Sequence, residues 1–365
     1  MRFPEFTKEW EMASLQDIAA VNPKSNPLQN SFVYIDLEAV EKGELRKIQE
    51  VMREEAPSRA QRVIYKNDIL FQCVRPYQKN NYIHKIQSKS NQQWVASTGY
   101  AQIRTTEIPN YIYHLLNTDG FNRKVMVRCT GSSYPAINSE DLATIRFYLT
   151  TDTKEQLKIS RLLDLLDERI ATQNKIIEKL QSLIKGIAQH CIKESTSGNT
   201  YVKLGDICQI TTGKLDANAQ VDNGIYPFFT CAEQPFKIDS FAFDTEALLI
   251  SGNGANLGYI NYYHGKFNAY QRTYVLDIFS ENIQYIKWAL KVLLPKRIAI
   301  EKSSSNTPYI VLSTLSDLRL PIPNKSIQCH IAKLMQSLER KLSSQIALNG
   351  SYNRLKQYLL RQMFI

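Results

Sequence analysis

The sequence predicts an α+β fold with an internal repeat. Two mixed, β-rich domains would be separated by two long helices, which form an intramolecular antiparallel coiled coil and give the chain a pseudo-two-fold repeat. Two observations support this class. A heptad pattern of apolar residues occurs once in mid-chain and once at the end, and the shorter predicted elements that precede each pattern come in the same order.

The heptad pattern defines a seam on each long helix. Apolar residues step alternately by four and three positions, which is typical of the a and d positions of a coiled coil. The second pattern lies 172 residues after the first, as Ile159 and Ile331 illustrate, and Gln173 and Gln345 occupy the same polar position. The predicted seam consists of Ile159, Leu163, Leu166, Ile170, Gln173, Ile177 and Leu180, and of Ile331, Met335, Leu338, Leu342, Gln345, Asn349 and Tyr352.

The matched length of the two patterns favours pairing within one chain. Antiparallel pairing with Ile159 opposite Met363 would place Gln173 near Asn349, which gives a polar layer close to the middle of both helices. Such layers lower stability but fix the register of a coil. A helix of about 40 residues is about 60 Å long, so the pair could hold two domains apart.

The residues before the second helix repeat those before the first. Leu15-Gln16-Asp17-Ile18 is echoed by Leu204-Gly205-Asp206-Ile207, and Tyr111–Leu116 is echoed by Tyr285–Leu290. Repetition in the same order indicates an internal duplication, with the globular part first and the long helix second. We therefore divide the chain into domains at residues 1–150 and 201–323, helices at 151–193 and 324–365, and a linker at 194–200.

Local patterns predict the elements of the first domain. Alternating apolar residues at 32–37 favour a strand, and the charged stretch 38–60, interrupted by Gly and Pro, is typical of a long loop. The runs 63–65 and 68–74 indicate a hairpin or two consecutive strands.

Composition excludes several classes of protein. No apolar run reaches the length of a membrane span, and the first residues lack the apolar core of a signal peptide, so a cytoplasmic protein is expected. Six cysteines and five histidines are scattered without metal-ligand spacing, which predicts free thiols and no metal site. The formal charge of +10 favours a polyanionic partner such as nucleic acid.

Catalytic motifs are missing from the sequence. The glycine-rich loop 251–258 follows a predicted strand, but another predicted strand follows it, so it does not match a phosphate-binding loop that opens a helix. Either its Asn side chains and amides touch a ligand, or it is a structural turn. Neither the carboxylate–lysine pattern of metal nucleases nor the Asn/Asp-Pro-Pro-aromatic motif of amino-methyltransferases is present. The chain is expected to be non-catalytic, with no cofactor of its own.

Polar residues in the predicted loops suit DNA recognition. Arg, Lys, Asn, Gln, Ser and Thr read base edges, and Lys, Arg and backbone amides grip phosphates. Candidates occur at similar places in both halves. They are Arg75, Tyr77, Lys79, Asn80, Thr98, Arg128, Ser132 and Ser133 in the first, and Lys214, Tyr226, Thr230, Asn253, Asn256, Gln271, Arg272, Lys302, Ser304 and Asn306 in the second.

Several strings place the chain near a known family. They are Arg2–Phe6 followed by Trp10, Tyr226–Cys231, Ala247–Asn256, Lys266–Ala269, and Leu318–Pro323 leading into Ile327–Ile331. With them the chain resembles the specificity (S) subunit of type I restriction–modification systems over nearly its whole length. The first half departs from the pattern, because Ile145–Leu149 lacks the prolines found at Leu318–Pro323.

The resemblance implies a division of labour. Residues 1–150 and 201–323 would be target recognition domains that each read one half of a gapped double-stranded DNA sequence, while 151–193 and 324–365 would be the conserved helices. The family assembles with two modification subunits, which methylate adenine with S-adenosylmethionine, and with restriction subunits. Two alternatives stay open: a scaffold whose duplicated domains bind peptides and are dimerised by the coil, and an enzyme with unfamiliar motifs.

Overall fold

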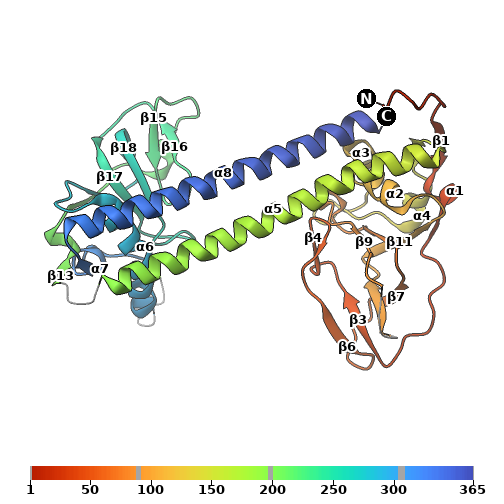
Figure 1. Ribbon diagram of the computed structural model, residues 1–365, viewed down its shortest axis with the longest axis horizontal. Coiled ribbons are helices and arrows are strands. Elements are labelled where there is room, and N and C mark those ends of the chain that lie inside the picture. Colours follow the sequence, from red (N-terminus) through yellow and green to blue (C-terminus); the bar gives the residue numbers. More distant parts are fainter. Residues whose placement is uncertain (1, 88–91, 196–199, 303–308, 365) are drawn as a thin grey trace. The chain divides into compact units, whose positions relative to one another are not determined.

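The computed structural model describes residues 2–87, 92–195, 200–302 and 309–364, with only the backbone at Lys302. The chain divides into two compact units, Met1–Asn174 with Leu348–Ile365 and Lys175–Ala347. Helices α5 (Thr153–Glu194) and α8 (Lys325–Met363) each run from one unit into the other without a break (Figure 1). Each unit therefore contains one globular part and a half of each long helix.

The first unit is built on two four-stranded sheets, ordered β2–β11–β8–β9 and β6–β3–β10–β7, with β1 paired to β12. Four short α-helices accompany them in the described part of the unit. The two chain ends lie close together here (Figure 1), where the rings of Trp10 and Phe364 are 6.2 Å apart. The elements are β1 Glu11–Ser14, α1 Leu15–Ile18, β2 Ala19–Val21, β3 Ser31–Ile35, β4 Val40–Glu41, β5 Glu44–Leu45, β6 Gln49–Met52, β7 Ala60–Ile64, β8 Ile69–Gln72, η1 Pro76–Gln78, β9 Tyr82–Ile83, β10 Gln93–Ser97, β11 Tyr100–Thr105, α2 Pro109–Leu116, α3 Asp119–Val127, α4 Ser139–Ala143 and β12 Arg146–Leu149.

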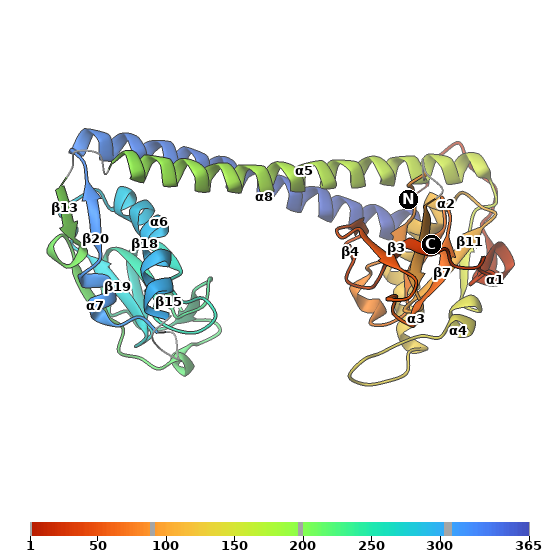
Figure 2. The same cartoon turned by 90° about the horizontal axis from the view of Figure 1, so that it is seen from below.

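The second unit is built on a six-stranded sheet, ordered β14–β19–β17–β18–β15–β16. The strand that precedes α8, β20, pairs with β13 (Figure 2). In the same way β12, which precedes α5, pairs with β1. The elements are β13 Thr200–Lys203, η2 Leu204–Asp206, β14 Gln209–Thr212, η3 Ala217–Ala219, β15 Tyr226–Phe229, β16 Phe236–Ile238, β17 Phe243–Ser251, β18 Ile260–Ala269, β19 Thr273–Asp277, α6 Ile283–Lys302, α7 Leu312–Ser316 and β20 Arg319–Ile322.

The predicted fold class is confirmed: both units mix strands and helices, and the long helices run antiparallel. In the first unit Asp167 of α5 pairs with Lys356 of α8, and Asn174 of α5 accepts a 2.8 Å hydrogen bond from Asn349 of α8. The later residue of α5 contacts the earlier residue of α8, so the two helices run in opposite directions. Every predicted seam position on both helices is buried or half-buried. The helix halves enter the core of their own unit, with Leu163 and Met363 in the first and Ile184 and Met335 in the second.

One local prediction was wrong, and another had left two alternatives that the structure decides. The stretch 38–60 is not a plain loop, because it contains β4, β5 and β6, and β6 extends the sheet at β3. Of the two alternatives for 63–65 and 68–74, the structure has two consecutive strands and not a hairpin, because β7 pairs with β10 while β8 pairs with β9 and β11 in another sheet. Alternating residues identify strands, but pairing partners far along the chain decide which sheet each strand joins.

The polar layer of the coil gives a first testable prediction. Gln173 is 6% exposed, and Asn349 Oδ1 is buried without a hydrogen-bond partner among the described residues. Replacing both residues with leucine should stabilise the coil by about 1–2 kcal/mol, because an unpaired buried oxygen is removed, while the register becomes less exclusive. Thermal melting measures the gain, with exposed Gln181→Leu as the control. A double variant that melts no higher than wild type would contradict the account.

His84 gives the second prediction. Its ring is 1% exposed and lies 4.8 Å from the ring of Trp94, and burial lowers its pKa to about 4. The unfolded chain takes up this proton near the ordinary pKa of about 6.5, whereas the folded chain does so only near pH 4. Stability is therefore full above pH 6.5 and falls as the pH drops toward 4.

Between pH 7.5 and 5 we expect His84 to account for a loss of about 2 kcal/mol in unfolding free energy. Urea unfolding of the wild type and of His84→Phe at the two pH values measures it. Equal pH dependence in both proteins would show that this histidine is not responsible.

Candidate nucleic-acid interface

Four segments of the second unit converge in one place, which we call the second-unit loop cluster: residues 213–215, 229–232, 251–256 and 270–273. Backbone hydrogen bonds join them, from Tyr270 N to Phe229 O at 2.9 Å, Gln271 N to Leu215 O at 2.9 Å and Gly252 N to Arg272 O at 2.8 Å. A Cβ atom on Gly252 would lie 2.5 Å from the Arg272 carbonyl oxygen, so this close approach requires glycine. The glycine-rich sequence thus lets three strand ends meet.

Side chains in this cluster fall into two groups. Asn253 accepts a 3.0 Å hydrogen bond from Cys231 Sγ, and Asn256 donates to the Cys231 carbonyl at 3.1 Å, so both are half-buried and tied to the loops. Lys214, Gln271 and Arg272 are exposed, and within the described chain neither cation is in an ion pair. The described cluster thus has two exposed cations, Lys214 and Arg272, and the exposed side-chain amide of Gln271, while the two asparagines hold its loops together.

The remaining candidates of the second unit are buried within the cluster or lie outside it. Thr230 is buried, and its hydroxyl accepts a hydrogen bond from Ala232 N, so it shapes the turn. Tyr226 begins β15 and packs against Phe241 with ring centroids 5.1 Å apart. Ser304, Asn306 and the Lys302 side chain fall outside the residues that the structure describes.

The first-unit loop cluster comprises residues 73–79, 98–99 and 130–137. Arg75 has a positive φ of 54°, donates its backbone N–H to Pro135 O, and places its guanidinium 4.3 Å from the centre of the Tyr134 ring. Tyr77, Ser132 and Ser133 are exposed around it. The αL backbone at Arg75 is uncommon for a side chain of this size, and the cation–π contact helps to hold the side chain in place.

Four further candidates of the first unit are engaged within the fold. Lys79 pairs with Asp119 at 2.7 Å, and Lys79 together with Arg361 lowers the pKa of that carboxyl. Asn80 accepts a hydrogen bond from Lys42 N, and Arg128 donates to Asp141 O and Thr144 Oγ1. Thr98 is half-buried and its backbone N–H donates to Arg59 O. Their residue types suit DNA contact, but the side chains of Lys79, Asn80 and Arg128 bind other parts of the unit.

The two clusters stand on the same backbone frame. In the first unit Cys73 N donates to Gly99 O and Ile137 N donates to Cys73 O, both at 3.0 Å. In the second unit Gly252 N donates to Arg272 O at 2.8 Å and Ile310 N to Gly252 O at 2.9 Å. The loop after β8 and the loop after β17 are therefore counterparts, and the duplication extends to these hydrogen bonds.

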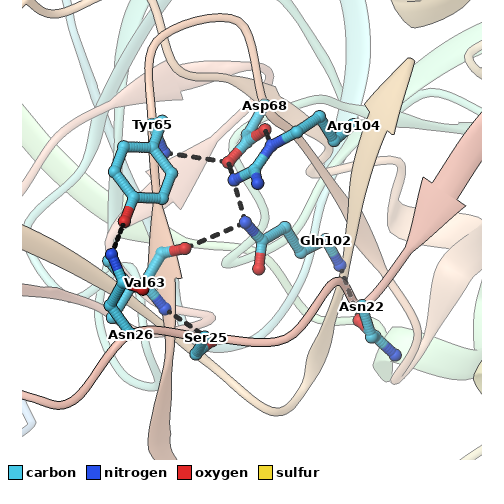
Figure 3. A network of polar contacts seen from close by, with 8 residues as sticks. All are labelled: Asn22, Ser25, Asn26, Val63, Tyr65, Asp68, Gln102 and Arg104. Carbon is cyan, nitrogen blue, oxygen red and sulfur yellow. Dashed lines mark hydrogen bonds and ion pairs between the residues drawn. The ribbon is translucent and has the colours of Figure 1, made fainter. Parts of the chain in front are cut away.

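A polar network that the sequence did not reveal supports the first unit (Figure 3). The Asp68 carboxylate is 1% exposed and accepts hydrogen bonds from Arg104 Nε and Nη2, Gln102 Nε2 and Tyr65 N at 2.7–2.8 Å. Asp68 raises the pKa of Arg104, whose guanidinium also lies 4.9 Å from the Tyr65 ring. The network joins β11 to the turn between β7 and β8.

Next to this turn is a recess of about 390 Å³ lined by Tyr65, His84, Trp94 and several amide side chains. Its lining holds no carboxylate or thiol. Across the described ranges no three His, Cys, Asp or Glu residues gather in a way that could hold a metal ion. In the same ranges, no helix has the length and apolar character needed to cross a membrane.

Comparison with known proteins follows this geometry. The whole chain superimposes on the S subunit of a type I restriction–modification system from M. genitalium, with a TM-score of 0.66 at 16% identity over 100% of this chain and 99% of that one, which shows the fold. The family model for the type I restriction modification DNA specificity domain matches residues 7–182 and again 196–349. The chain belongs to this family and carries its domain twice.

Two curated relatives match parts of the chain. The type I restriction enzyme EcoDI specificity subunit of Escherichia coli is 42% identical over 143 residues, which are 39% of this chain and 32% of that protein. The MjaIX specificity subunit of Methanocaldococcus jannaschii is 22% identical over 275 residues, 64% of this chain and 63% of that protein. The matches thus span less than two thirds of either relative.

Proposed function

We propose that this chain is the DNA sequence-specificity subunit of a type I restriction–modification enzyme. Each unit reads one half of a gapped double-stranded DNA target, and the coil sets the gap. The observation that carries this proposal is the pair of loop clusters built on the same backbone frame in a family of DNA specificity domains. The predicted domain boundaries, with recognition domains at 1–150 and 201–323, belong to the same proposal.

The chemistry of the loop clusters supports DNA reading. Arg272 and Lys214 carry charges that no carboxylate of the described chain neutralises, which suits phosphate contact or a bidentate bond to guanine. Gln271 offers the amide that pairs with adenine, and in the first unit Arg75 stands among exposed hydroxyls. The net charge of +10 adds a sequence-independent attraction.

The faces of the long helices support partner docking. Ile176 and Leu183 on α5 are 42% and 53% exposed, and Leu348 and Leu355, which lie 172 residues later on α8, are 39% and 45% exposed. Exposed apolar residues in a repeated pattern mark interaction surfaces. We assign these equivalent faces to two modification subunits, which would bring S-adenosylmethionine and adenine methylation. Restriction subunits would join that complex in the cytoplasm, and this chain would supply no catalytic group.

A scaffold that binds peptides is the second candidate, and salt dependence separates it from DNA binding. We expect binding to a duplex containing both half-sites to weaken steeply as salt rises, because each phosphate contact releases a counterion. In Arg272→Ala the slope should fall by about one counterion if this residue grips a phosphate. The exposed Arg123→Ala serves as the control. Binding without any salt dependence would favour the peptide scaffold.

A further inference from the structure

The start of each long helix carries the same buried glutamine, and its contacts are duplicated. Gln156 of α5 and Gln328 of α8 are both fully buried. Nε2 of Gln156 donates to Glu107 Oε2 and Thr150 O, each at 2.7 Å, while its Oε1 accepts from Ile108 N at 3.2 Å. We call this set of three hydrogen bonds a glutamine bridge.

The second glutamine bridge repeats the first bond for bond. Gln328 Nε2 donates to Glu281 Oε2 at 2.7 Å and to Pro323 O at 2.8 Å, and its Oε1 accepts from Asn282 N at 3.0 Å. The helix-start residues also correspond, because Asp152 Oδ1 accepts from Glu155 N at 3.3 Å and Asn324 Oδ1 accepts from Ile327 N at 3.0 Å. Each bridge ties its long helix to the residues just before a helix of the preceding domain. This helix is α2 for Gln156 and α6 for Gln328.

Nearby ion pairs are not duplicated in this way. Glu155 of α5 pairs with Arg2 at 2.6 Å, whereas the corresponding position on α8 is Ile327, which has no charge. Around the coil itself, His114 faces Asp164 in the first unit, while Lys287 and Lys291 face Glu339 in the second. Among the described residues, the glutamine bridge therefore recurs in both units, whereas these ion pairs do not.

Directional hydrogen bonds control an angle that apolar packing leaves loose. Packing angles between elements scatter by about 15–20° when side-chain ridges alone determine them. Neighbouring base pairs differ by about 3.4 Å in rise and, at 10–10.5 per turn, by about 34–36° in direction. Two domains that each scattered by 15–20° could together absorb the rotation of one base pair, and a neighbouring gap length would then be accepted.

We propose that Gln156 and Gln328 are positioning residues that make the gap length specific. Each bridge holds one recognition domain at a fixed rotation on its own long helix, so an error of one base pair in the gap cannot be absorbed there. The inference rests on the proposed function, because a gap exists only if the two units read separate half-sites. It assigns the bridges no contact with DNA.

Gln156→Met combined with Gln328→Met tests the proposal, since methionine keeps the length of the side chain but none of its hydrogen bonds. The full chain is produced with its modification subunits, and adenine methylation is measured on plasmids that carry the wild-type half-sites at the native gap and at gaps one base pair shorter and longer. We expect the preference for the native gap to fall by about tenfold, the factor for one net buried hydrogen bond. The half-site sequences should stay the same.

Matched controls replace exposed glutamines of the same helices, Gln181→Met in α5 and Gln357→Met in α8, and should keep the full preference. If the double variant only methylates less at every gap, with an unchanged ratio, the bridges are structural supports and the proposal fails. Should that variant not accumulate, Glu107→Ala with Glu281→Ala decides, because it removes one acceptor from each bridge. A preference lowered by about threefold supports the proposal, and an unchanged ratio overturns it.

The measurement on the wild-type complex separates this inference from the proposed function. A wild-type complex that shows no preference for any gapped site would overturn the function itself. Normal gap preference in wild type together with the same ratio in the bridge variants would overturn only the role of the two glutamines.

Discussion

Insertion of three heptads into both long helices is expected to lengthen the recognised gap by about one turn of DNA. The insertions belong between Asn174 and Lys175 and between Ala347 and Leu348, where the two compact units divide. Twenty-one added residues extend a helix by about 32 Å and preserve the heptad seam, and one DNA turn spans about 34–36 Å. Both the distance and the rotation of the recognition domains therefore match a gap longer by nine or ten base pairs.

A single-heptad insertion is the matched control for this experiment. Seven residues add about 10.5 Å, close to three base pairs of rise, but three base pairs rotate the DNA by about 100° while the seam keeps its direction. We expect this variant to bind no gapped duplex with the wild-type affinity. Selection from duplexes with all gap lengths measures both variants. An unchanged preferred gap in the three-heptad variant would show that the coil does not set it.

Arg104→Met is expected to destabilise the first unit by about 3 kcal/mol. The change leaves the Asp68 carboxylate, which is 1% exposed, without its cation, and an unpaired buried charge typically costs 3–5 kcal/mol. We expect the lower end of this range, because Gln102 Nε2 and Tyr65 N still donate to the carboxylate. Trp94, which belongs to this unit, reports the transition in urea.

A second variant separates the charge from the shape. Asp68→Asn in the Arg104→Met background should restore most of the lost stability, because no buried charge is then left unpaired. Arg123→Met, at an exposed position, should change stability by about 0.5 kcal/mol or less. If the unfolding free energy of Arg104→Met lies within about 1 kcal/mol of the wild-type value, the ion pair with Asp68 does not stabilise the first unit as expected.

The long helices show what a sequence reveals well. Heptad spacing is local and repeats over many residues, so it indicated both helices and a polar position at Gln173. Their antiparallel direction was expected from the family resemblance. The order of shorter elements revealed the duplication for a related reason, since insertions in loops shift numbers without changing order. The glycine-rich loop also stood out, and Gly252 proved to be required by contact with the Arg272 carbonyl.

Pairwise polar contacts show what stayed hidden. Gln156 precedes the predicted seam and resembles any other glutamine of a helix, and its partner Glu107 lies 49 positions away. Asp68 and Arg104 are 36 residues apart, and Lys79 looked free for DNA although it binds Asp119 forty residues later. No local period encodes such pairs, because the folded backbone brings them together. Helix α3, which the sequence did not predict, has apolar residues spread over a mainly polar run.

Genome-wide mapping of adenine methylation, in cells with and without this chain, tests the central claim most directly. The account predicts a gapped motif with two half-sites that is methylated in the presence of the chain and unmethylated without it. Replacing the second-unit loop cluster with the corresponding loops of another specificity subunit should then alter one half-site and leave the other intact. Methylation that is unchanged by loss of the chain, or that is confined to one uninterrupted motif, would contradict the account.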